Sequence, residues 1–157
     1  MKLRVLCVGR LSEAHLRDGA EDYAGRIARY LPLNVEELKE EKGARKNDLR
    51  VIREREGERL LQRLAPEAFV VVLDERGRSL TSEDLAGQLD RHMTRGTAEL
   101  VFVIGGAYGL SEAVKTRANL LLSLSTMTFT HQMARLFLLE QIYRGLTILR
   151  NEPYHNR

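Results

Sequence analysis

Long apolar runs without polar alternation are the feature that most constrains the fold of this chain. Residues 68–74 (AFVVVLD) and 100–104 (LVFVI) are the clearest runs, and 3–9 (LRVLCVG) and 119–125 (NLLLSLS) resemble them. A strand with one buried face alternates apolar and polar residues, whereas a strand of a parallel sheet covered by helices on both faces does not. The runs therefore predict an α/β fold in three layers, with a parallel sheet between two layers of helices.

The segments between these runs have the spacing and the end signals of helices. Apolar residues recur every three or four positions over 16–31, and a similar pattern returns from 131 to about 150. Thr81 or Ser82 is a candidate cap for a further helix, which Gly96 would end. Helices that alternate with strands in this way indicate crossover connections between parallel strands.

Three further segments carry weaker signals. Between 36 and 63, 17 of 28 residues are charged, with eight acidic and nine basic side chains. This balance predicts a solvated helix joined by ion pairs, with Asn47 or Asp48 as its cap. Residues 75–78 (ERGR) are predicted to form a turn, and a short helix is predicted from Ser111.

Length and cysteine content limit the class of protein. The 157 residues, 1–157, are expected to form one domain. Cys7 is the only cysteine, which excludes an intrachain disulfide and a multi-cysteine metal site. No window has the ~18 consecutive apolar residues of a membrane span, and the first apolar run is too short for a secretory signal. A cytoplasmic protein with no membrane segment is expected.

The charge of the chain hints at nucleic acid without proving it. The net charge is only +3, but 20 of the 25 basic side chains are arginine. The planar guanidinium group suits phosphate groups and base edges. An arginine-rich composition is also what a genome of high GC content would give, so both interpretations remain open.

The carboxyl ends of the predicted strands are the expected place for a ligand, as in other parallel α/β sheets. These ends are Leu73-Asp74, Ile104-Gly105 and Leu124-Ser125. Loop 105–109 (GGAYG) would let a ligand approach the backbone closely, but its spacing is that of neither a dinucleotide-binding loop nor a phosphate loop. Loop 124–130 (LSTMTFT) offers hydroxyl groups beside Met and Phe. The alternative is that both loops only connect a strand to a helix.

The last predicted helix is more apolar than one buried face requires. From Met133 to Leu149, 11 of 17 residues are apolar. Cover on two sides is therefore expected, and a symmetric second copy would supply it, which predicts a homodimer. Arg135 falls within the apolar face, so its guanidinium needs a partner or a ligand. Arg144 stands four residues after Glu140, and an ion pair between them is the simpler interpretation.

Four histidines have different settings. His155 belongs to the polar, aromatic C-terminal segment 151–157, where Tyr154 and a terminal arginine add a stacking ring and a cation. A frayed end is the common alternative for such a segment. His131 is predicted to begin the last helix, and His15 and His92 are predicted to lie on helix surfaces.

Several motifs together resemble one known family. FVIGGAYGL at 102–110, LSLSTMTFTHQMAR at 122–135, EQIYRG at 140–145 and the terminal PYH are similar to segments of the ribosomal RNA large-subunit methyltransferase H family. That family belongs to the SPOUT class of knotted methyltransferases. The resemblance covers the whole chain. One departure is Gln132, where many relatives have proline.

The resemblance implies a homodimeric enzyme with a deep trefoil knot near the C-terminus. It implies that S-adenosyl-L-methionine is the methyl donor and that N3 of pseudouridine 1915 in 23S ribosomal RNA, in the stem-loop called helix 69 within the assembled 70S ribosome, is the acceptor. The cofactor positions of the family fall here on Leu73, Gly105, Leu124, Ser125, Thr126, Met127, Thr128 and Phe129. These residues lie at the strand ends selected above.

The implied chemistry needs a base or a cation near the acceptor nitrogen, because an imide proton must leave as the methyl group arrives. We expect His155 to serve this role, Tyr154 to orient the uracil ring, and Arg135 and Arg144 to hold phosphate or carbonyl oxygens. No metal is expected. Two alternatives are a non-catalytic ribosome-associated RNA-binding protein and a knotted methyltransferase that acts on transfer RNA.

Overall fold

The structure is a computed structural model that describes residues 1–42 and 48–156. Five parallel strands form one sheet in the order β2-β1-β4-β3-β5. In chain order the elements are β1 (Lys2–Val8), α1 (Ala14–Ile27), β2 (Leu33–Leu38), α2 (Leu49–Gln62), β3 (Phe69–Ser79), α3 (Ser82–Arg95), β4 (Glu99–Ile104), α4 (Glu112–Arg117), β5 (Leu120–Ser123) and α5 (His131–Leu149). The predicted parallel α/β class is confirmed.

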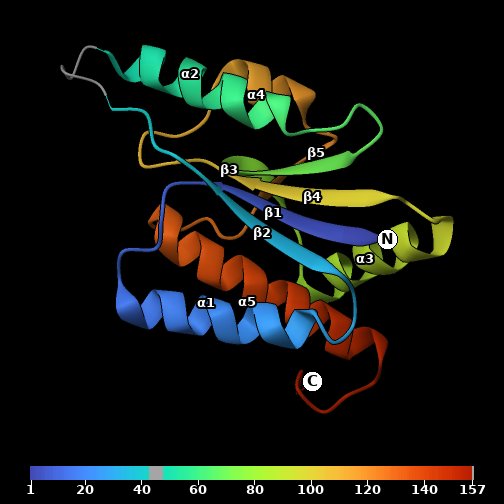
Figure 1. The fold of residues 1–157 in the computed structure, drawn as a ribbon. Helices are drawn as coiled ribbons and strands as arrows, with labels where there is room; N and C mark the ends of the chain where they lie inside the picture. Colours follow the sequence, from blue (N-terminus) through green and yellow to red (C-terminus); the bar gives the residue numbers. More distant parts are fainter. Residues whose placement is uncertain (43–47, 157) are drawn as a thin grey trace.

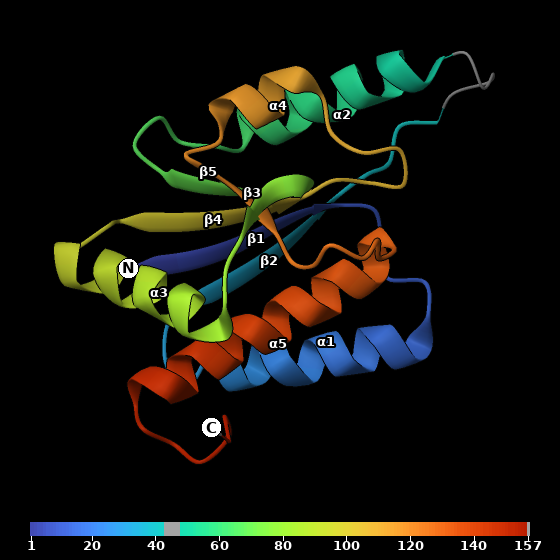
Figure 2. The same cartoon turned by 180° about the vertical axis from the view of Figure 1, so that it is seen from behind.

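The helices lie in two layers, one on each face of the sheet. Helices α2 and α4 cover one face, and α1, α3 and α5 cover the other, as the two opposite views show (Figures 1 and 2). Each face has its own apolar core. Along β4, Phe102 and Ile104 belong to one core, whereas Val101 and Val103 belong to the other. Both faces of the central strands are therefore buried, which is why their sequences do not alternate.

Short side chains at helix starts explain several of the predicted boundaries. The Thr81 hydroxyl accepts a hydrogen bond from the Asp84 amide, and the Asp84 carboxylate accepts one from the Thr81 amide, so α3 begins with a capping box. Gly96 ends α3 with φ of 70°, in the left-handed region. Asp48 precedes α2 without a side-chain cap, and Asn47, the other candidate, lies outside the described residues.

The predicted turn at 75–78 is wrong, because β3 continues through it to Ser79. The pairing of β3 with β5 shifts register between Leu73 and Arg78, so the strand bends and then pairs again. Gly77 makes this possible. A Cβ atom there would lie 2.7 Å from the backbone carbonyl oxygen of Leu121, so only glycine lets β5 pass this close.

Two other expectations need correction. His92 is not a surface histidine: it is 6% exposed, its ring lies 4.2 Å from the Phe69 ring centroid, and its Nδ1 atom bonds the Thr97 hydroxyl. Burial lowers the pKa of His92. The predicted first helix ends at Ile27, four residues before Leu31.

Helix α5 obtains its cover within its own chain. It packs against α1 and α3 as well as the sheet, and of its residues only Met133 is exposed. The apolar surplus of this helix is therefore no argument for a second copy, and the homodimer stays a prediction. Among the described residues, no helix is both long enough and apolar enough to cross a membrane.

Candidate functional site

A cleft of about 970 Å³ opens at the carboxyl ends of β4 and β5 and beside the middle of β3. It also reaches the start of α1 and the first turn of α5, which contribute Leu16 and Ala134 to its wall. The strand ends that the sequence selected, Leu73-Asp74, Ile104-Gly105 and Leu124-Ser125, all line it, although β3 itself continues past Leu73-Asp74 to Ser79. A parallel sheet brings these ends to one edge, although they are far apart in the chain.

Most residues predicted to hold a cofactor lie in this wall. Those that line the cleft are Leu73, Gly105, Leu124, Ser125, Met127, Thr128 and Phe129; Thr126 belongs to the same loop but is not among the lining residues. Their role toward a cofactor stays a prediction. Within the residues that the structure describes, no group of three or more His, Cys, Asp or Glu side chains could hold a metal ion.

Loop 124–130 is organised by its own hydroxyl groups. The Ser123 hydroxyl donates to the Ser125 carbonyl at 2.9 Å, and the Ser125 hydroxyl accepts from the Met127 amide at 3.0 Å. Thr130 caps α5 by accepting from the Met133 amide at 3.1 Å. The simpler interpretation of this loop as a helix cap is therefore correct for Thr130, while Met127 remains 75% exposed beside the cleft.

The glycine-rich loop 105–109 packs closely against neighbouring side chains. A Cβ atom at Gly105 would lie 2.7 Å from Leu110 Cγ, and one at Gly106 would lie 3.1 Å from Val8 Cγ1 and 3.3 Å from Glu56 Oε1. Gly106 lines the cleft on its other side. The backbone of this loop is thus the surface that a ligand would touch, since there is no room for side chains at these two positions.

Sequence reasoning missed Glu56, because it lies within a helix that the charge pattern predicted to be solvated. Its side chain is 4% exposed; Oε2 accepts from the Glu41 amide at 3.0 Å, and Oε1 has no partner among the described residues. Burial raises the pKa of this carboxyl group, which the neighbouring carboxylate of Glu40 reinforces. Ile52 and Leu60, which the spacing of apolar residues predicts to face inward, are buried with it, and their positions four residues before and after Glu56 are the signal that could have found it.

Two polar features of the first turn of α5 also border the cleft. His131 begins the helix as predicted, its buried Nε2 atom has no partner among the described residues, and burial lowers its pKa. Gln132 fixes the turn to the loop before α1, because its Oε1 accepts from the Ser12 amide at 3.1 Å and its Nε2 donates to the Ser12 hydroxyl at 3.0 Å. The residue that departs from the family pattern thus has a structural role.

Arg135 is buried and has partners within the chain. Its guanidinium forms an ion pair with Glu37 on β2 and donates to the Gly9 carbonyl at 2.8 Å. The expectation that this guanidinium needs a partner is confirmed. These bonds tie α5 to the ends of β1 and β2, so the geometry favours a structural task for Arg135, and its contact with RNA stays a prediction.

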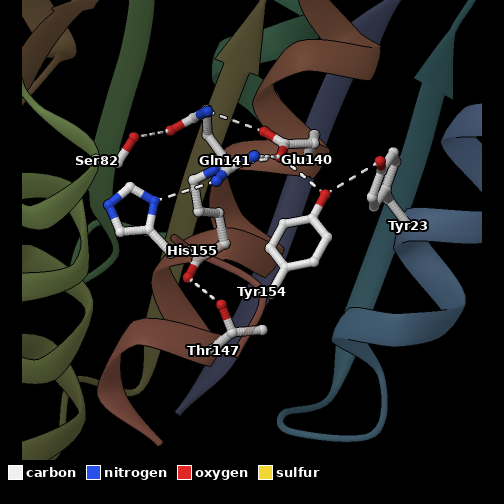
Figure 3. A network of polar contacts seen from close by, with 8 residues as sticks. Tyr23, Ser82, Glu140, Gln141, Thr147, Tyr154 and His155 are labelled. Atoms are coloured by element: carbon white, nitrogen blue, oxygen red, sulfur yellow. Dashed lines mark hydrogen bonds and ion pairs between the residues drawn. The ribbon is translucent and has the colours of Figure 1, made fainter. Parts of the chain in front are cut away.

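Tyr154 and His155 of the C-terminal segment are bound to side chains of their own chain, so this part of the segment is not frayed (Figure 3). The Tyr154 ring packs edge-on against Tyr143 at 4.7 Å, and its hydroxyl donates to Glu140 at 2.9 Å. The Tyr154 hydroxyl also lies 3.2 Å from the hydroxyl of Tyr23 on α1. Burial and these hydrogen bonds raise the pKa of Tyr154, so its hydroxyl keeps its proton.

Arg144 connects this tyrosine to His155. Its guanidinium bonds Glu140 at 2.6 Å, as the simpler interpretation predicted, and lies 4.8 Å from the Tyr154 ring centroid. It also donates to His155 Nδ1 at 3.1 Å, and His155 Nε2 lies 3.0 Å from Glu83. Since arginine has no acceptor, a hydrogen bond between these two groups has Nδ1 of His155 as its acceptor, and Nε2 then donates to Glu83.

The structure places the predicted residues in two groups. The cleft lies at the first turn of α5, whereas Arg144 lies about 20 Å further along the helix axis at a rise of 1.5 Å per residue. Tyr154 and His155 are bound beside Arg144. Within one chain, therefore, the predicted cofactor residues and the predicted catalytic tail do not meet.

Comparison with known proteins finds matches that extend over nearly the whole chain. A family described as "Predicted SPOUT methyltransferase" matches residues 1–155. The chain is 60% identical over 157 residues to the ribosomal RNA large subunit methyltransferase H of Syntrophotalea carbinolica, with 100% of both chains covered. It is 54% identical over 156 residues to the proteins of the same name from Trichlorobacter lovleyi and Geotalea uraniireducens, with 99% of this chain and 100% of each relative covered.

Proposed function

Because the chain belongs to the SPOUT methyltransferase family, we propose that it methylates large-subunit ribosomal RNA, with S-adenosyl-L-methionine as the donor and N3 of a pseudouridine in 23S ribosomal RNA as the acceptor. The observation that carries this proposal is the coincidence of three things at one edge of the sheet. The carboxyl ends of β4 and β5 lie there, the large cleft opens there, and seven of the eight residues predicted to hold the cofactor line it.

The residues of the cleft suit this donor. Leu73, Leu124 and Phe129 offer apolar surface for a flat ring, and the tightly packed Gly105 leaves the backbone open to a ligand. The hydroxyl of Thr128 adds a polar group at the same wall. The group bound there would supply a methyl sulfonium centre, which is cationic and loses its charge when the methyl group leaves.

The C-terminal segment supplies the side chains for the acceptor. We infer that His155 accepts the N3 proton of the base at Nδ1, the atom that accepts from Arg144 in this structure. Arg144 would then be free to stabilise a carbonyl oxygen as negative charge develops on the ring. Tyr154, which keeps its proton, can donate a hydrogen bond or pack against the base.

The separation of these groups along α5 supports a homodimer. Since the tail of one chain lies about 20 Å from its own cleft, we propose that it serves the cleft of a partner copy. A mixture of a His155→Ala variant and a Gly105→Ala variant should regain activity that neither shows alone. A mixture as inactive as its components, although the two chains exchange, would contradict this arrangement.

The family also implies a knot near the C-terminus, and we propose it for this chain. The match of the SPOUT family over residues 1–155 supports it. A threaded chain is rare among proteins.

The decisive experiment is methyl transfer from labelled S-adenosyl-L-methionine to purified 70S ribosomes, followed by mapping of the modified nucleotide. Free transfer RNA and protein-free ribosomal RNA serve as parallel substrates. Label on one pseudouridine of the large subunit is expected. Label on transfer RNA alone would show that transfer RNA, and not ribosomal RNA, is the substrate. No label on any RNA, together with no cofactor binding in calorimetry, would overturn the proposed function.

A further inference from the structure

The arginines that sequence reasoning assigned to RNA are already bound within the chain. Arg135 is buried against Glu37 and the Gly9 carbonyl, and Arg144 is bound to Glu140 and His155. A side chain that holds an RNA phosphate must instead be exposed and uncommitted in the free protein, because bonds to other groups would have to be broken first. Exposed arginines near the cleft are therefore the place to look.

Two such arginines stand in the part of β3 that was predicted to be a turn. Arg76 and Arg78 are both exposed, and neither guanidinium has a hydrogen bond or ion pair to any part of the chain that the structure describes. Gly77, which stands between them, lies against the backbone of β5 at Leu121 and Leu122. The two arginines therefore flank the point where β3 and β5 approach most closely, and both side chains are open to solvent.

The pair lies directly beside the mouth of the cleft. Glu75, the neighbour of Arg76, lines the cleft and accepts a hydrogen bond from the Thr128 hydroxyl at 3.4 Å. This bond ties the strand extension to the cofactor loop. Met127 of that loop is largely exposed and also lines the cleft, so an apolar surface adjoins the two cations.

We propose that Arg76 and Arg78 form a phosphate-binding clamp for the RNA strand that delivers its base to the cleft. The proposal rests on the proposed function, since the partner is ribosomal RNA. Residues two apart in an extended strand are separated by about 7 Å along the chain, at 3.3 Å of rise per residue, close to the separation of neighbouring phosphates in an extended nucleic-acid chain. Arg78 is paired with Leu122 of β5, which fixes the backbone at this end of the pair.

The test is the affinity of the protein for purified 70S ribosomes at a series of KCl concentrations. An R76Q/R78Q variant should bind more weakly. The negative slope of log K against log[KCl] should become shallower by about two, one for each lost phosphate contact. An R76K/R78K variant keeps both charges and should keep most of the slope. Calorimetry should give an unchanged affinity for S-adenosyl-L-methionine in both variants.

The matched control is R91Q/R95Q. Arg91 and Arg95 are exposed in the last turns of α3, which leads into the start of β4 at the opposite edge of the sheet, and the change in net charge is the same. The clamp is wrong, and the proposed function is untouched, if R76Q/R78Q has the slope of the wild type or if R91Q/R95Q makes the slope equally shallow. Wild-type protein that neither binds nor methylates ribosomes overturns the proposed function and the clamp together.

Discussion

Replacement of Arg135 by methionine separates a structural role from an RNA-binding role. The side chain is 3% exposed and connects α5 with Glu37 on β2 and with the Gly9 carbonyl at the end of β1. Methionine fills a similar volume, so the Arg135→Met change removes polar contacts without creating a large cavity. If the role is structural, stability should fall while the salt dependence of ribosome binding stays the same.

The size of the loss follows from the two partners. A hydrogen bond from a charged donor to the buried Gly9 carbonyl contributes about 1.5–3 kcal/mol. The Glu37 side chain is 40% exposed, so water can solvate it after the change and the ion pair adds only about 0.5–1 kcal/mol. The free energy of unfolding should therefore fall by about 3 kcal/mol, which lowers Tm by roughly 6–12 °C in a domain of this size.

Urea unfolding and ribosome binding measure the two effects on the same protein. Arg29→Met is the control, because Arg29 is exposed in the turn that follows α1 and its loss should change stability by less than about 0.5 kcal/mol. A double change with Glu37→Gln should cost less than the sum of the single changes. An Arg135→Met protein of wild-type stability that has lost affinity for ribosomes, with a lower salt slope, would refute the structural assignment.

Three further outcomes are expected. Gly77→Ala should lower the free energy of unfolding by about 1–3 kcal/mol through overpacking against β5, whereas Gly87→Ala, with open space on α3, should not; equal urea midpoints would contradict this. Burial raises the pKa of Cys7 in the folded protein to about 11, so the thiol ionises at a lower pH in the unfolded chain than in the folded protein. The neutral buried thiol therefore stabilises the fold fully below about pH 8.5, and this stabilisation is lost as the pH rises toward 11. Urea titrations from pH 8 to 10.5 should show this decline in the wild type and a smaller one in Cys7→Ala. His155→Ala should abolish most methyl transfer while calorimetry gives the wild-type cofactor affinity, and full activity would remove His155 from the reaction.

The α/β class, the ends of β4 and β5 and most helix boundaries could be predicted because each depends on local pattern. Consecutive apolar residues in 68–74 and 100–104 require burial on both faces, and that holds for any parallel sheet they join. Thr81 and Gly96 mark the ends of α3 through contacts with residues a few positions away. The position of the cleft followed in turn, since parallel strands end at one edge.

The hydrogen-bond and ion-pair partners of individual side chains depended on the tertiary structure. Arg135 meets Glu37 across 98 positions of sequence, and His155 meets Glu83 across 72. No local pattern specifies such pairs, because they form only when separate elements pack together. The same reason explains the extension of β3 through Gly77, which needs β5 beside it, and the cover of α5 by α1 and α3. The sequence alone thus determined most of the elements and the edge of the sheet where the cleft lies, whereas packing decided which charged groups are bound within the chain and which remain exposed.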